Sequence, residues 1–272
     1  MRKLLKKLYR KIDGNRFVNF DVFCNNIQSK FSIVFAHNIL NNHQDMQFLI
    51  DKFSDTHNVI AIDFSGHAGS DNLNEYNYDS YLSDCLSVIN QANSKYIIWI
   101  GQGIGGIIGA KLASHIANPI VGLVAFDCDQ FSNNNVSSND VEYEYNNLIE
   151  AKEAIYSKYS DIDRNILDKF SLNKYKVMNE MFVNNYHIGI IAQLDNFFNC
   201  DLVKIFNDVR SRALLIGKKD LIDKVNDMDV CKEEHEIKLL HKEEHINLIH
   251  GWVTDIMNDP HMFLNQFKKY MS

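Results

Sequence analysis

A glycine-rich segment is the first place in the chain where chemistry is expected. Gly101-Gln102-Gly103-Ile104-Gly105-Gly106 lies between the apolar run YIIWI and the small-residue stretch IIGAKLA. The first run predicts a buried strand and the second a helix, so the backbone N–H groups at this turn are placed to bind an anion or a carboxylate. The segment lacks the Lys-Ser/Thr pair of a Walker loop, and no acidic residue follows in the register that a dinucleotide site needs. We therefore predict no nucleotide or other cofactor here.

Histidines are concentrated in the C-terminal part of the chain, where a base or metal ligands could lie. They are His235, His241, His245, His250 and His261. Their spacing does not place two of them at i, i+4 on one clear helix, and the chain has no C-x-x-C pair, so no metal site is predicted. The five cysteines are odd in number and widely scattered, which indicates a reducing compartment rather than a disulfide framework.

Short apolar runs alternate with helical patterns along most of the chain, which is typical of strand-helix-strand units around a parallel sheet. An edge strand is predicted at 16–23. Further strands are predicted at 31–37, 58–64, 96–101, 119–127, 212–220 and 235–241, and helices at 43–53, 78–92, 105–117 and 260–271. The predicted core therefore spans 16–128 and 209–272.

The segment 129–208 interrupts this alternation with polar, Asn-rich and Tyr-rich sequence. Helices are predicted at 145–159 and 164–185. We interpret the segment as a helical cap domain inserted into the core, whose aromatic side chains line an apolar pocket over the site, pack against the main domain, or do both.

The first 15 residues form a basic, amphipathic leader. Six of the first 12 residues are Lys or Arg, and Leu4, Leu8 and Ile12 fall on one face of a predicted helix. We expect this face to pack against the protein, while weak contact of residues 1–12 with an anionic membrane surface stays open.

Composition narrows the function classes. The chain has 272 residues, 46% hydrophobic and 23% charged, and a formal charge of −7. This balance indicates a folded globular protein and no broad basic surface for nucleic acid. No apolar run reaches the ~20 residues needed to cross a bilayer, and the N-terminus lacks a secretory signal, so a cytoplasmic location is expected.

Four separated motifs resemble those of the α/β-hydrolase superfamily. Ala36-His37-Asn38 resembles the His-Gly turn after the third strand, with Asn38 in place of the usual Gly. The stretch from Asp63 to Ser70 is similar to the D-x-x-G-x-G-x-S loop after the following strand. The glycine-rich turn falls where the superfamily has its G-x-S-x-G nucleophile elbow. The resemblance covers the chain from Arg16 to Ser272 and implies a mostly parallel central sheet flanked by helices.

The fourth motif concerns the acid and the base. Leu215-Ile216-Gly217-Lys-Lys-Asp220 resembles the strand-end G-x-x-D that provides the acid, and the run from His245 to Gly251 resembles the H-x-x-F-x-x-G pattern around the base. The resemblance therefore implies Asp220 as acid and His245 as base, with His250 as the alternative base. It also implies an oxyanion hole from the amides of Asn38 and Ile104.

The resemblance fails at the nucleophile, because Gly103 occupies the position of the serine, flanked by Gly101, Gln102 and Gly105. Without that hydroxyl, ordinary acyl-enzyme chemistry is lost, typically at a cost of about a millionfold in turnover. Glycine adopts the strained elbow conformation without steric cost, so the exchange is also stabilising. Cys128 follows a predicted strand and is interpreted as a small core residue rather than a displaced nucleophile.

Three hypotheses follow. The first is a pseudoenzyme, a noncatalytic protein that binds a small acyl-bearing or apolar ligand or a protein partner. The second is an esterase- or lipase-like hydrolase in which Asp220 and His245 activate a water molecule. The third is an ordinary serine esterase in which Gly103 is an engineered replacement.

Overall fold

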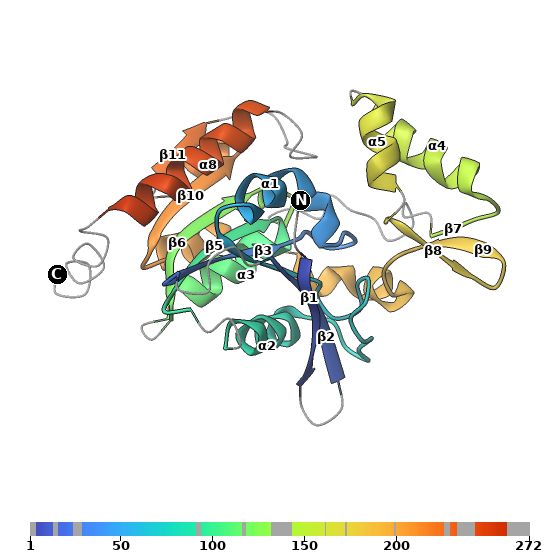
Figure 1. Cartoon of the computed structure of the whole chain (residues 1–272), viewed down its shortest axis with the longest axis horizontal. Helices are drawn as coiled ribbons and strands as arrows, with labels where there is room; N and C mark the ends of the chain where they lie inside the picture. The colour runs from blue at the N-terminus through green and yellow to red at the C-terminus, as the bar shows by residue number, and fades with distance from the viewer. Residues whose placement is uncertain are drawn as a thin grey trace.

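The computed structural model describes residues 4–12, 16–23, 29–90, 94–115, 118–131, 143–160, 162–171, 173–198, 200–225, 229–232 and 243–259. Its centre is a sheet of eight described strands in the order β1-β2-β4-β3-β5-β6-β10-β11 (Figure 1). The strands in this order are β1 (Leu4–Ile12), β2 (Arg16–Phe23), β4 (Asn58–Ile62), β3 (Phe31–Ala36), β5 (Tyr96–Gln102), β6 (Ile120–Phe126), β10 (Arg212–Gly217) and β11 (Asp229–Lys232). Pairing is parallel from β4 to β11 and antiparallel at β1 and β2. This is the mostly parallel sheet that the sequence predicted.

Helices cover both faces of the sheet because its strands carry apolar side chains on both sides. In β5, Ile97 and Trp99 belong to one buried cluster, and Ile98 and Ile100 belong to the other. The first face is covered by α2 (Tyr78–Ile89), α3 (Ile104–Ala113) and α6 (Leu202–Asn207), and the second by α1 (Gln47–Ser54) and α8 (Glu243–Asn258). The carboxyl ends of the parallel strands therefore meet at one edge between two helical layers, where ligand sites form in such sheets.

The N-terminal leader is a strand and not the predicted helix. β1 pairs antiparallel with β2, from Leu4 opposite Phe23 to Ile12 opposite Arg16. This pairing provides hydrogen-bond partners for an edge of β2 that would otherwise be open, and it outweighs the local helical pattern. The strand at 16–23 is correspondingly the second strand of the sheet and not its edge.

The segment between β6 and β10 contains strands as well as helices. After the short 3-10 helix η2 (Asp129–Phe131) come α4 (Leu148–Lys158), α5 (Arg164–Ser171) and a second sheet of β7 (Glu144–Tyr145), β9 (Met181–Asn184) and β8 (Tyr175–Met178). These elements lie together at one end of the molecule, beside the main sheet (Figure 1). The 3-10 segment η4 (Ile188–Phe197) leads from them to α6.

The helix predicted at 164–185 is only partly correct, since it ends at Ser171 and residues 175–184 form a hairpin. The hairpin turn is made by Asn179 and Glu180, which both have positive φ, at 51° and 65°. Two consecutive residues with positive φ match the twist of a two-residue hairpin and are incompatible with a continuous helix.

The C-terminal part contains a helix that the sequence analysis did not predict. α8 begins at Glu243 and carries His245 and His250. The strand predicted at 235–241 and the helix predicted at 260–271 lie outside the described residues. β11 precedes them and pairs parallel with β10.

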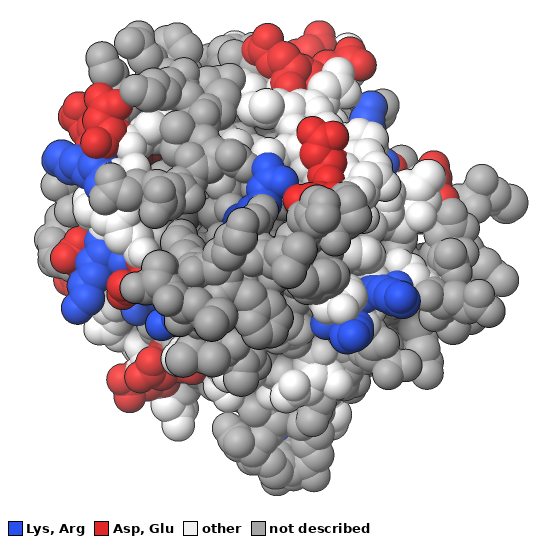
Figure 2. All heavy atoms as spheres, turned by 90° about the vertical axis from the view of Figure 1, so that its left-hand side faces the viewer, with Lys and Arg blue, Asp and Glu red and all other residues white. Residues whose placement is uncertain are grey.

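Charges on the described surface are mixed. Lys and Arg are interspersed with Asp and Glu on the face shown in Figure 2. No helix in the described part of the chain has the length and apolar character that crossing a membrane requires.

Candidate functional site

Gly103 makes the sharp turn between β5 and α3. Its backbone has φ 52° and ψ −117°, and it is the N-cap residue of α3. The N–H of Gly103 donates to the carbonyl oxygen of Phe126 on the neighbouring strand at 2.8 Å. A residue with a Cβ pays roughly 1–3 kcal/mol in such a conformation, and glycine does not. The turn therefore has the strand-to-helix form that the sequence predicted, at the carboxyl edge of the sheet.

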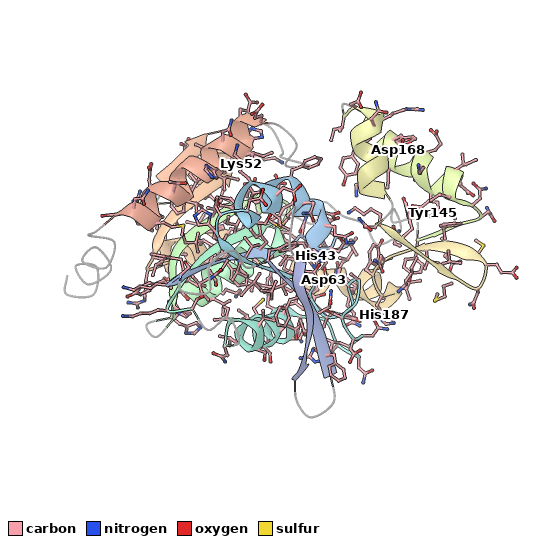
Figure 3. All side chains as sticks on the ribbon, in the orientation of Figure 1. His43, Lys52, Asp63, Tyr145, Asp168 and His187 are labelled. Atoms are coloured by element: carbon pink, nitrogen blue, oxygen red, sulfur yellow. The ribbon has the colours of Figure 1, made fainter. Side chains whose placement is uncertain are left out.

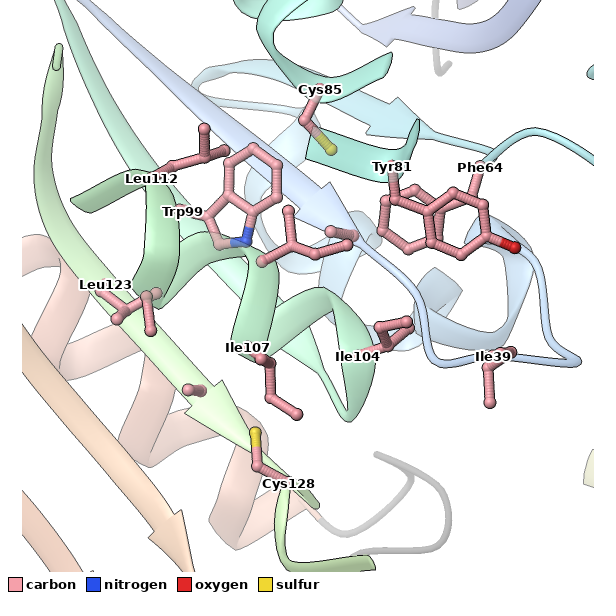
Figure 4. Close-up of a cluster of buried hydrophobic side chains, with 14 of the residues drawn as sticks. Ile39, Phe64, Tyr81, Cys85, Trp99, Ile104, Ile107, Leu112, Leu123 and Cys128 are labelled. Carbon is pink, nitrogen blue, oxygen red and sulfur yellow. The ribbon is translucent and has the colours of Figure 1, made fainter. Parts of the chain in front are cut away.

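The neighbouring glycines allow α3 to pack closely on the sheet. A Cβ on Gly105 would lie 2.2 Å from the carbonyl oxygen of Ala36 in β3, which no side chain can occupy. The indole N–H of Trp99 donates to the carbonyl oxygen of Gly105 at 2.9 Å. In Figure 4, Ile104 and Ile107 extend from this first part of α3 among buried apolar side chains.

The side chain of Asn38 fills the space next to Gly103. A Cβ on residue 103 would lie 2.0 Å from Oδ1 and 2.3 Å from Cγ of Asn38. The same Oδ1 accepts hydrogen bonds from the N–H groups of Ile39, at 2.8 Å, and Ile104, at 3.2 Å. These two amides converge as oxyanion-hole donors do. The side chain of Asn38 thus accepts from both of these amides.

The amides around Asn38 bear on the predicted oxyanion hole. The sequence predicted the amides of Asn38 and Ile104 as its two donors; in the structure the N–H groups of Ile104 and Ile39 donate to Asn38 Oδ1, and the oxyanion hole itself stays a prediction. Asn38 contributes an acceptor instead, because its carboxamide folds back over the turn. Two departures in the sequence could have indicated this contact. Asn38 replaces the usual Gly of the His-Gly turn, and Gly103 replaces the usual Ser of the G-x-S-x-G motif.

The turn that carries Asn38 is held by two buried imidazoles. His37 Nδ1 lies 2.6 Å from the carbonyl oxygen of Asn38, and its Nε2 accepts from the N–H of Phe64 at 3.1 Å. His67 Nε2 accepts from the N–H of Leu40 at 3.2 Å, and its Nδ1 lies 3.2 Å from the carbonyl oxygen of Ser65. In both rings Nε2 is an acceptor, so Nδ1 carries the proton and donates.

Burial keeps these two rings neutral. It lowers the pKa of His37 to about 4, although Asp63 acts in the opposite direction. Burial likewise holds the pKa of His67 well below its ordinary value, with His37 adding to the effect. Neutral imidazoles can accept the backbone N–H groups that fix this turn, whereas protonated ones could not.

A network of buried charged side chains lies near His37 and His67. His43, in the 3-10 helix η1 (His43–Met46), donates from Nδ1 to Asp63 at 2.8 Å, and its Nε2 lies 3.3 Å from a carboxylate oxygen of Asp21. Burial disfavours the charged ring, but Asp63 and Asp21 outweigh it and raise the pKa of His43 to about 10. Burial raises the pKa of Asp63, but His43 lowers it more strongly, and the resulting pKa is about 2. Figure 3 labels His43 and Asp63, which lie next to each other in the main part of the molecule.

The loop from Asp63 to Ser70 is held by the hydroxyl of Ser70. The hydroxyl of Ser70 donates to the carbonyl oxygen of Asp63 at 2.7 Å and accepts from the N–H of Asn19 at 2.8 Å. Ala68 stands where the pattern has its second Gly and has φ 45°. The loop thus ties β2 to the end of β4, below the site.

The predicted acid and base lie in different surroundings. Asp220 is exposed in the short helix α7 (Lys219–Ile222), and His245 is buried in the first turn of α8. The ring of His250 lies 5.0 Å from that of Phe53 in α1, and burial and Lys52 lower its pKa. The structure therefore brings Gly103, Ile104 and Asn38 together, and the roles of Asp220, His245 and His250 stay predictions.

Two residues after β6 also contact the elbow. The amide nitrogen of Gln102 donates to Asp127 at 2.9 Å, a partner that the sequence analysis did not identify. The thiol of Cys128 lies 3.4 Å from the carbonyl oxygen of Gly103, and burial raises its pKa well above the ordinary value. A protonated thiol behind the turn is a poor nucleophile, which agrees with its interpretation as a core residue.

Comparisons of the sequence with known proteins give a short match. No protein-family model matches the chain. A curated relative, 3-hydroxybutyrate-oligomer hydrolase from Cupriavidus necator, is 28% identical over 98 residues, which are 35% of this chain and 33% of the relative. The match thus spans about a third of the length of that relative.

Solved structures match over nearly the whole chain. A putative hydrolase from Rickettsia typhi has a TM-score of 0.74 at 22% identity, covering 92% of this chain and 97% of that one. An α/β hydrolase from Novosphingobium aromaticivorans has a TM-score of 0.76 at 14% identity, covering 92% and 98%. E-2-(acetamidomethylene)succinate hydrolase also has 0.76, at 17% identity, covering 92% and 100%. The chain therefore has the α/β-hydrolase fold.

Proposed function

We propose that this chain is a noncatalytic protein of the α/β-hydrolase fold that binds a small acyl-bearing or apolar ligand or a protein partner. The observation that carries the proposal is the occupied elbow: Gly103 has no nucleophilic atom, and Asn38 fills the space above it. Removing the nucleophile of such a site typically costs about a millionfold in turnover.

Asn38 also weighs against hydrolysis by an activated water molecule. That mechanism needs a position for the substrate carbonyl within reach of two N–H donors. The amides of Ile39 and Ile104 already donate to Asn38 Oδ1, so a substrate carbonyl must first displace it.

The same contact supports Gly103 as a native residue rather than an engineered one. A serine at this position would place its Cβ 2.0 Å from Asn38 Oδ1, so the two side chains cannot coexist without rearrangement. Asn38 and Gly103 fit each other as a matched pair.

A fluorophosphonate probe tests the proposal, with hydrolysis of p-nitrophenyl acetate and butyrate measured in parallel. The wild type is expected to remain unlabelled and to hydrolyse the esters no faster than its His245→Ala and Asn38→Gly variants. Labelling of any residue in the wild type would overturn the proposal. Ester hydrolysis that disappears in His245→Ala would instead support the activated-water mechanism.

Ligand screening can begin with the chemistry of the relatives. The matched relative is named for hydrolysis of 3-hydroxybutyrate oligomers, so short hydroxyacyl esters are a reasonable first set. Binding without turnover is the expected result.

A further inference from the structure

The turn that carries Asn38 and the residues after it contact the segment between β6 and β10, and Lys174 makes two of these contacts. Lys174 precedes β8, and its ammonium donates to Oδ1 of Asn41 at 2.9 Å and binds the carboxylate of Asp45. Alongside it, the side-chain amide of Asn42 donates to the carbonyl oxygen of Asn173 at 3.0 Å. These contacts join residues about 130 positions apart in sequence.

The lysine contact is well shielded from water. The side chain of Lys174 is 11% exposed and that of Asp45 is 4% exposed. Removing one member of a buried ion pair leaves the other charge without compensation, which costs far more than breaking a surface pair.

The segment that carries Lys174 is itself held in place. The N–H of Asn185 donates to the carbonyl oxygen of Lys174 at 2.7 Å, and the N–H of Ala68 donates to that of Asn185 at 2.8 Å. Lys174 is thus anchored through Asn185 to the loop after β4, on the main sheet. Lys174 is therefore positioned by the main sheet when it binds the turn that carries Asn38.

The turn needs such support because its backbone is strained. Leu40 has φ 62°, a conformation that disfavours residues with a branched side chain, and the N–H of Asn41 closes the turn on the carbonyl oxygen of Asn38 at 3.2 Å. Asn38 is only partly buried. A relaxed turn could therefore move its carboxamide away from the elbow towards solvent.

We propose that Lys174 holds the Asn38 turn in the conformation that occupies the oxyanion site, so that the inserted segment controls access to that site. Release of Lys174 from Asn41 and Asp45 lets the Asn38 carboxamide leave and exposes the N–H groups of Ile39 and Ile104. This inference rests on the proposed function, since it assigns a control to the same occupied elbow.

Hydrogen exchange of the Ile39 and Ile104 amides, followed by NMR on the full chain, tests this control. Lys174→Met is expected to accelerate exchange of both amides by roughly tenfold or more, towards the rates in Asn38→Gly, which lacks the acceptor altogether. Amides of Ile98 and Ile100 in β5 are expected to keep wild-type rates. Lys176→Met, an exposed lysine two residues away, is the matched control and should change neither pair.

The experiment has clear contrary outcomes. Wild-type exchange of Ile39 and Ile104 in Lys174→Met, combined with fast exchange in Asn38→Gly, would overturn the proposed control. If Lys174→Met accelerates the β5 amides as well, Asn41→Ala is used in its place, because it removes the contact between Lys174 and the turn. Unchanged exchange of Ile39 and Ile104 in Asn41→Ala would likewise overturn the proposal. Exchange does not depend on turnover, so these outcomes are separable from probe labelling, which tests the proposed function.

Discussion

Oδ1 of Asn38 lies 2.0 Å from the point that a Cβ on residue 103 would occupy, so a serine at 103 requires the Asn38 carboxamide to move. Glycine at 103 leaves the room that this carboxamide fills. The two residues that depart from the superfamily pattern are therefore in direct contact.

The first prediction concerns this pair. Gly103→Ser alone should destabilise the protein by more than the roughly 1–3 kcal/mol of backbone strain, because Asn38 must also move. Asn38→Gly should remove that second part, so the double variant should be more stable than the sum of the two single changes predicts. Urea unfolding of the four proteins measures the coupling, expected at about 0.5–3 kcal/mol. Additive free energies would show that the two side chains do not compete.

A second prediction concerns the charged network of His43. The pKa of His43 rises from 6.5 to about 10 in the folded protein, so its contribution to stability is fully present below pH 6.5 and is lost as the pH rises towards 10. The pKa of Asp63 falls from 3.8 to about 2, so its contribution is present above pH 3.8 and is lost as the pH falls towards 2. His43→Gln leaves two carboxylates facing each other and should cost about 3–5 kcal/mol at pH 7.

Unfolding free energies at pH 5, 7 and 9 measure both effects. The wild type should lose stability between pH 7 and 9 by more than His43→Gln does. An equal loss in the two proteins would contradict the protonated state of His43.

The third prediction concerns the neutral ring of His37. Its folded pKa is lowered from 6.5 to about 4, so the unfolded chain binds more protons between these values. Stability from this group is complete above pH 6.5 and declines as the pH falls from 6.5 towards 4. An NMR titration of the imidazole should show it neutral at pH 5.5, with loss of the Asn38 turn only when it finally protonates. A midpoint near 6.5 would show that the ring is not desolvated.

The sequence was sufficient to predict the strand-turn-helix around Gly103, but not the position of the Asn38 side chain beside it. The apolar run before Gly101 and the small residues after Gly103 specify a strand, a tight turn and a helix through local preferences, and all three occur. The position of the Asn38 carboxamide depends instead on tertiary contacts with Ile104, and no local pattern encodes them.

The two elements that were predicted with the wrong type have the same explanation. β1 is amphipathic at helical spacing but gains its hydrogen bonds from β2, and the hairpin at 175–184 depends on the positive φ of Asn179 and Glu180. In both cases a partner strand decided between two local possibilities.

The last prediction separates two glycines that look equivalent in the sequence motifs. Gly105 lies against the backbone of β3, where a Cβ would be 2.2 Å from the carbonyl oxygen of Ala36, whereas a Cβ on Gly251 in α8 would meet nothing within 4 Å. Gly105→Ala must therefore push α3 away from the sheet and should destabilise the protein by several kcal/mol, at the severe end of single substitutions. Gly251→Ala should stabilise it by about 0.5–1 kcal/mol, since alanine loses less backbone entropy in an exposed helix interior. Thermal unfolding of both variants and the wild type measures the difference in stability. A destabilised Gly251→Ala would show that a side chain is not tolerated at this position of α8.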